Sequence, residues 1–130
     1  MNKKELDALV ERVHELASFV ALSDWTFKVT PTKTKNWAEI HIQDYNHADI
    51  IIGPKFIAAN EKIRDQTILH ELMHCHTQRI INVYEEMLAL VHMNIPDILL
   101  KMTAKVAHQR EEEVVEGLAV AVNNLLRGEE

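Results

Sequence analysis

Apolar side chains near the start of the chain recur every three or four positions. They run from Leu6 to Val20, and this spacing places them on one face of a helix. Ser23 and Asp24 interrupt the pattern. The pattern therefore predicts an amphipathic helix over residues 4–22, and its apolar face carries Leu6, Leu9, Val10, Val13, Leu16, Ala17 and Val20.

The period then changes to two, which is typical of strands with one buried face. Apolar and polar residues alternate over residues 25–30 and again over residues 37–43. A third, mostly apolar run covers residues 48–52 and is followed by a Gly-Pro pair. Because the connections are short, we predict a small, mostly antiparallel sheet in which the three strands form a meander in chain order.

The rest of the chain has helical spacing of its apolar residues in three segments, residues 61–79, 83–93 and 96–127. Pro96 suits the first turn of the last helix, because its missing amide hydrogen would have no partner there, and Gly128 suits the end of that helix. We expect one α+β domain spanning residues 1–130, with the helices packed on one face of the sheet.

Length and composition narrow the class of protein. The chain has 130 residues, 47% of them hydrophobic, and one cysteine, Cys75, so a core can form but an intrachain disulfide cannot. No apolar run approaches the roughly 18 residues of a membrane-spanning helix, and the charged first residues do not resemble a signal peptide. The net charge of −6 disfavours nonspecific binding to a polyanion such as nucleic acid. We expect a cytoplasmic protein with neither membrane nor nucleic-acid partners.

The segment TILHELMH, within residues 61–79, carries the candidate chemistry. His70 and His74 lie about 40° apart around the helix axis, so one ion can reach both imidazoles. Glu71 points about 100° away from His70, where it can miss the ion yet reach a water bound to it. A chance arrangement on a structural helix is the simpler alternative. Against it, the motif faces away from the apolar side of this helix, which is formed by Ile68, Leu69, Leu72, Met73 and Cys75.

Two histidines and a glutamate in this order form the H-E-x-x-H motif, and on it the chain resembles the zincin metallopeptidases. More narrowly, it resembles minimal gluzincins and the ImmA/IrrE-like proteins of phages and mobile elements. The likeness covers most of the chain, including the leading helix, the strand WTFKVT and the later helix REEEVVEGLAVAV. The resemblance implies a Zn²⁺ ion held by His70, His74 and a glutamate of a later helix, with peptide-bond hydrolysis as the reaction.

The last predicted helix offers several candidate third ligands. At about 100° per residue, Glu111 lies about 20° from Leu118, the centre of its apolar face. An unpaired carboxylate on a buried face is costly, so we predict Glu111 as the third metal ligand. Glu112 is the second choice, because it has Glu116 one turn later, as in the thermolysin-like branch. Glu113 points outward and is predicted to be a solvated charge. The apolar face comprises Ala104, Ala107, Val114, Val115, Leu118, Ala121, Val122 and Leu125.

Other histidines remain as alternatives. His92 follows His74 by 18 positions, a gap at which a third histidine ligand could serve in an SprT-like arrangement. His108 lies near the glutamates, although a satisfied, partly buried histidine is the simpler interpretation. His76 falls on the apolar side of its helix and is expected in the core or at an interface. Cys75 is expected to be a small buried hydrophobe.

The expected function is a zinc-dependent metallopeptidase in which Glu71 is the general base that accepts a proton from the attacking water. The alternative is a regulatory or binding protein that keeps the zincin scaffold without measurable hydrolysis. The expected partner is a peptide or protein substrate, and by family analogy residues 37–43 would take it up as an added strand. The oligomeric state and the phage or host origin stay open.

Overall fold

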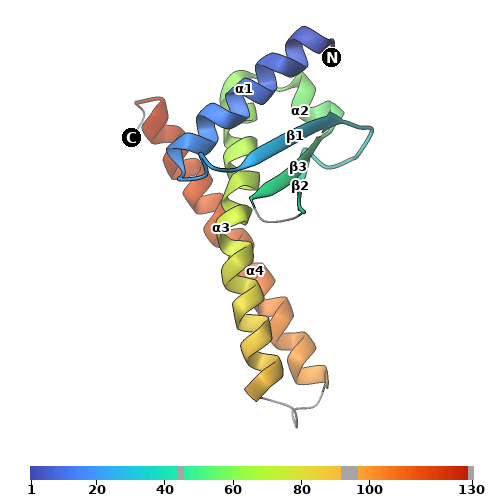
Figure 1. Ribbon diagram of the computed structural model, residues 1–130, viewed down its shortest axis with the longest axis vertical. Helices are drawn as coiled ribbons and strands as arrows, with labels where there is room; N and C mark the ends of the chain where they lie inside the picture. The colour runs from blue at the N-terminus through green and yellow to red at the C-terminus, as the bar shows by residue number, and fades with distance from the viewer. Residues whose placement is uncertain (44–45, 92–96, 129–130) are drawn as a thin grey trace.

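The computed structural model describes residues 1–43, 46–91 and 97–128. Its element order matches the α+β class expected from the sequence, with a leading helix, three strands and two long helices (Figure 1). A short helix after the third strand had not been predicted, and it begins with Pro54 in its first turn and buries Phe56. The elements are α1 (Lys3–Phe19), β1 (Thr26–Pro31), β2 (Ala38–Ile42), β3 (His47–Ile52), α2 (Pro54–Ala58), α3 (Glu61–Val91) and α4 (Asp97–Leu126).

The sheet is mixed, and its strand order is β1-β3-β2. The predicted meander is therefore wrong: β1 pairs with β3 in parallel, and β2 pairs with β3 antiparallel. The physical reason lies in β3, which is the most apolar strand and buries Ala48, Ile50 and Ile52. In the central position this strand pairs with two neighbours and is more buried, whereas the half-buried β2 lies at an edge of the sheet.

The core lies between one face of the sheet and the helices α1 and α3. Alternate residues of β1 and β3 point into it, and they meet the apolar face that the sequence predicted for α1. Helix α3 adds Ile68, Leu69 and Leu72, all buried. The apolar side predicted for the motif helix is therefore confirmed, and α3 is fixed against the sheet with its histidines on another side.

Helix α3 is one continuous helix, where the sequence had predicted two pieces with a break near residues 80–82. No Gly or Pro stands in that interval, and one polar residue in an apolar pattern does not end a helix. The predicted end of the second piece, together with His92 and Pro96, lies outside the described residues. In Figure 1 the paired α3 and α4 continue beyond the sheet as a two-helix arm.

Helix α4 packs on α3 with a face different from the predicted one. Leu118, the expected centre of the buried face, is 45% exposed, and Leu125 is 78% exposed. The residues that are buried centre about 80° around the axis from Leu118, so the predicted centre was wrong, although Glu111 and Val115 are buried as predicted. The residues actually buried on α4 recur every four positions and are Glu111, Val115, Ala119 and Asn123.

Both long helices carry charged side chains along much of their length. Among the described residues, no helix is long and apolar enough to cross a membrane.

Candidate metal centre

His70 and His74 lie on adjacent turns of α3, as their spacing predicted. Their ring centroids are 5.2 Å apart, and both side chains are largely covered. The opposite side of the helix is fixed in the core by Leu69 and Leu72, so the two imidazoles have a rigid base.

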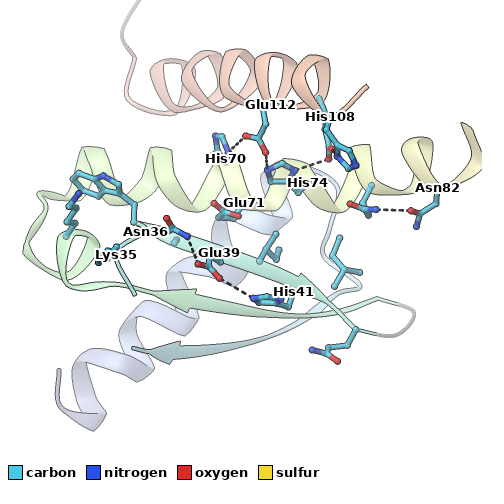
Figure 2. A pocket seen from close by; sticks show the side chains of 18 residues that line it. Lys35, Asn36, Glu39, His41, His70, Glu71, His74, Asn82, His108 and Glu112 are labelled. Atoms are coloured by element: carbon cyan, nitrogen blue, oxygen red, sulfur yellow. Dashed lines mark hydrogen bonds and ion pairs between the residues drawn. The ribbon is translucent and has the colours of Figure 1, made fainter. Parts of the chain in front are cut away.

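Glu112 of α4 lies across from both imidazoles (Figure 2). Its Oε2 is 3.2 Å from Nε2 of His70, and its Oε1 is 3.1 Å from Nε2 of His74. These three side chains form a group that could hold a metal ion, with one ligand atom from each lying within 4.8 Å of the others. Two imidazole nitrogens and one carboxylate oxygen are a donor set found in catalytic zinc sites.

The other nitrogen of each imidazole has its own carboxylate partner, again from α4. Nδ1 of His70 is 2.5 Å from Oε2 of Glu116, and Nδ1 of His74 is 2.9 Å from Oε1 of Glu111. An ionised carboxylate only accepts hydrogen bonds, so each Nδ1 donates its proton. With Nδ1 protonated, the lone pair of a neutral imidazole is on Nε2, the atom that faces Glu112.

The predicted first-choice ligand, Glu111, is buried as expected but contacts the far nitrogen of His74. Its Oε1 also accepts a hydrogen bond of 2.7 Å from Thr77. Because the buried face of α4 is rotated from the predicted one, Glu112 takes the place next to both Nε2 atoms. The third ligand stays a prediction, and the geometry moves it from Glu111 to Glu112. Glu113 is exposed and pairs with Arg110, in keeping with a solvated charge.

The carboxylate of Glu111 is buried yet well partnered. Burial raises its pKa, but the hydrogen bonds from His74 and Thr77 outweigh this and hold the pKa below its ordinary value. Nδ1 of His108 lies 3.5 Å from Oε2 of Glu111. These hydrogen-bond donors thus offset the desolvation free energy expected for a buried carboxylate. Thr77 was not among the predicted site residues, because its only signal in the sequence is a hydroxyl three positions after His74 on the same helix.

Glu71 is only 9% exposed and lies beside the two histidines (Figure 2). Burial raises the pKa of its carboxyl to about 7, and the positive charge that His70 and His74 can carry opposes that rise. A carboxyl that titrates near neutrality can both accept and release a proton at physiological pH, as a general base requires.

A large cleft of about 1240 Å³ passes the histidines and Glu71. One wall comes from α3 and α4, and the other comes from residues 35–43, which include β2 at the edge of the sheet. Glu39 and His41 of β2 line it, and Glu39 is held by a 2.5 Å hydrogen bond from Asn36. The sequence had indicated this strand but not these side chains.

Among the described residues, Cys75 and His76 do not belong to the metal-binding group. Cys75 is buried, and burial raises the pKa of its thiol to about 12, so it is the inert hydrophobe expected. His76 is exposed, so the core position predicted for it is wrong, while the interface position stays a prediction. Its Nε2 lies 2.5 Å from the carbonyl oxygen of Val20. His92 lies outside the described residues, and nothing tests it as a ligand.

Comparison with protein families, with curated proteins and with solved structures found no match to this chain. What the geometry supports directly is a candidate metal-binding group of His70, His74 and Glu112 in an α+β chain.

Proposed function

We propose that this chain is a zinc-dependent metallopeptidase of the zincin type, with His70, His74 and Glu112 as ligands and Glu71 as general base. One observation carries the proposal: both Nε2 atoms converge on the carboxylate of Glu112, beside a buried glutamate that belongs to the same motif. A structural helix has no need of either feature.

The donor set fits Zn²⁺ better than a hard ion such as Mg²⁺, which prefers an all-oxygen shell. A zinc ion bound there would act as a Lewis acid on a substrate carbonyl and would lower the pKa of water. Glu116 and Glu111 fix the orientation of the two imidazoles through Nδ1, so that the Nε2 atoms stay aimed at one point.

Glu71 supplies the proton chemistry. It accepts a proton from the water that attacks the scissile carbonyl and then passes it to the leaving amine, which departs neutral. Its position in the cleft, shielded from bulk water, supports this role.

The substrate proposed is an extended peptide. Within the described part of the chain, strand β2 pairs with β3 alone, and its other side borders the cleft that contains Glu71. An added strand on β2 would bind through backbone hydrogen bonds and bring its own peptide groups past the histidines. This extends the expectation for residues 37–43.

Two measurements on the purified protein test the proposal. Elemental analysis should give about one zinc per chain, as expected for a site with three protein ligands. A peptide-library digest should show cleavage by the wild type and by Glu113→Gln, the matched surface control, but not by Glu71→Gln, which should keep its zinc. Absence of zinc after refilling would sink the proposal. Zinc without cleavage would favour the alternative, a regulatory or binding protein on this scaffold.

A further inference from the structure

The cleft beside the candidate metal centre differs in charge between its two ends. Lys35 and Lys55 are the only lysines or arginines among the described residues that line it. At the far end α3 contributes Gln78 and Asn82, whose uncharged amides hydrogen-bond to each other at 2.8 Å. Figure 2 shows Lys35 and Asn82 at opposite ends of the cleft, with the two histidines between them. The cleft therefore has a cationic end, although the chain has a net charge of −6.

The backbone before β2 places both lysines at this end. Strands β2 and β3 pair antiparallel, and just beyond the paired residues the amide of Gly53 donates a 3.0 Å hydrogen bond to the carbonyl of Trp37. The same register, continued by two residues, puts Lys35 opposite Lys55. The two segments pack so closely that a Cβ at position 53 would collide with the carbonyl oxygen of Asn36. A fixed backbone therefore holds the two lysines near each other.

The chain itself does not neutralise these two charges. Both lysines are exposed, and no described residue forms a hydrogen bond or an ion pair with either ammonium group. Glu39, on the adjoining strand, instead accepts hydrogen bonds from Asn36 and Thr34, at 2.5 and 3.2 Å. Two like charges held near each other repel, and an anion that binds to both removes this repulsion. This end of the cleft therefore favours an anionic group.

We infer that Lys35 and Lys55 select a substrate peptide that carries a carboxylate at this end of the cleft, on one side of the cleaved bond. The inference rests on the proposed peptidase function and specifies its substrate class. Either an acidic side chain or the free C-terminus of the peptide supplies the carboxylate. Nearer the metal group the same carboxylate would approach Glu39, so its position along the peptide decides whether it is attracted or repelled.

The experiment uses zinc-loaded Glu71→Gln, which should bind peptides without cleaving them. The probes are fluorescently labelled octapeptides of serine and alanine, capped at both ends, in which one Asp replaces each position in turn and Asn at the same position is the uncharged partner. Fluorescence anisotropy should show Asp binding at least about fivefold tighter than Asn, at positions on one side of the peptide centre only. Because the charges are exposed, about 0.5 M salt should reduce the advantage to roughly twofold or less.

A second series identifies the source of the carboxylate. These peptides contain no acidic side chain and end in a free C-terminus, each with an amidated partner of the same length. A similar advantage of the free acid at one length would show that the terminal carboxylate occupies this end of the cleft. An advantage in either series supports the inference.

Substitutions test whether the two lysines are responsible. Lys35→Gln and Lys55→Gln should each reduce the advantage to about twofold, and Lys35→Glu combined with Lys55→Glu should reverse it in favour of a peptide with Lys in place of Asp. Lys33→Gln is the matched control, because Lys33 is exposed in the same segment but does not line the cleft, and it should keep the full advantage. The zinc content of each variant verifies that it folds.

Equal affinity for the charged and uncharged peptides in both series, including no binding of either, would overturn the inference. An advantage that survives both Gln variants, or that falls as far in Lys33→Gln, would also overturn it, since general surface charge would then explain the preference. Failure of the proposed function has a different signature: the protein takes up no zinc, or the wild type does not cleave the peptide that Glu71→Gln binds best.

Discussion

The two regions that meet at helix α3 are held together by different forces. On one side, α3 packs against the sheet and α1 through buried apolar residues such as Leu16, Ile50 and Leu72. On the other side, α3 packs against α4. Among the described residues of α4, the buried hydrophobic ones are Val115 and Ala119. The sheet side supplies most of the hydrophobic core, and among the described residues α4 adds these two, with the partly buried Val122 and Leu126 packed against the core.

Several polar contacts form a seam between α3 and α4. Asp65 is buried and binds both Arg12 and Arg127, and the buried Asn123 donates to the carbonyl of Lys62. Further along, the seam consists of the glutamate contacts to His70, His74 and Thr77. A typical protein hydrogen bond contributes only about 1 kcal/mol net. The attachment of α4 to α3 therefore depends partly on hydrogen bonds and ion pairs, and an ion shared by His70, His74 and Glu112 would strengthen it.

The sharpest test of this contrast is one truncation on each side. Leu16→Ala, in the apolar region, should lower the free energy of unfolding by about 2–5 kcal/mol through lost burial and a cavity. Leu125→Ala, on the exposed face of α4, should change it by less than about 0.5 kcal/mol. Urea unfolding of metal-free protein measures both. A large loss at Leu125 would show that the outer face of α4 is covered in solution.

Glu71 should make metal-free protein less stable as the pH rises. Its folded pKa of about 7 lies above its ordinary value of 4.5, so the folded state keeps this proton after the unfolded state has lost it. Stability is therefore lost between about pH 4.5 and 7, by up to roughly 3 kcal/mol. Glu71→Gln lacks this loss. Its free energy of unfolding, relative to that of the wild type, should therefore be higher at pH 8 than at pH 5, as denaturation at both pH values would measure. Parallel pH profiles would refute the raised pKa.

Substitutions along α4 should separate the ligand from the groups that orient the histidines. Glu112→Gln should weaken zinc binding by more than about a hundredfold, and Glu111→Gln by about tenfold through the Nδ1 proton of His74. Glu113→Gln should leave affinity unchanged. Competition titrations with a chromophoric chelator would rank the zinc affinities of the three variants. If Glu111→Gln loses more than Glu112→Gln, the original choice from helical phase was correct.

Zinc should tighten the polar seam and leave the apolar region as it is. Because the ion would bridge α3 and α4, amide hydrogen exchange in α4 should slow by at least about tenfold on zinc addition, with α1 and β3 unchanged. Glu112→Gln should show no such slowing at the same zinc concentration. Equal slowing throughout the chain would mean that zinc does not act chiefly on the contact between α3 and α4.

The sequence by itself determined what depends on local spacing. The apolar face of α1, the three strands and the placing of His70, Glu71 and His74 on one helix all follow from periods of two or 3.6 residues. The backbone alone fixes where such side chains point relative to their neighbours in sequence, so these predictions needed no tertiary information.

Only the tertiary structure decided which surfaces meet. It placed β3 between β1 and β2, because the most apolar strand gains most from two neighbours. It also chose the face of α4 that packs on α3: hydrogen-bonding partners on α3 draw in Glu111 and Asn123, while Leu118, the apolar residue that periodicity favoured, remains exposed. Helical phase measures hydrophobicity around one helix but contains nothing about the partner helix. The rotation that brings Glu112 to both histidines is therefore a property of the contact between α3 and α4.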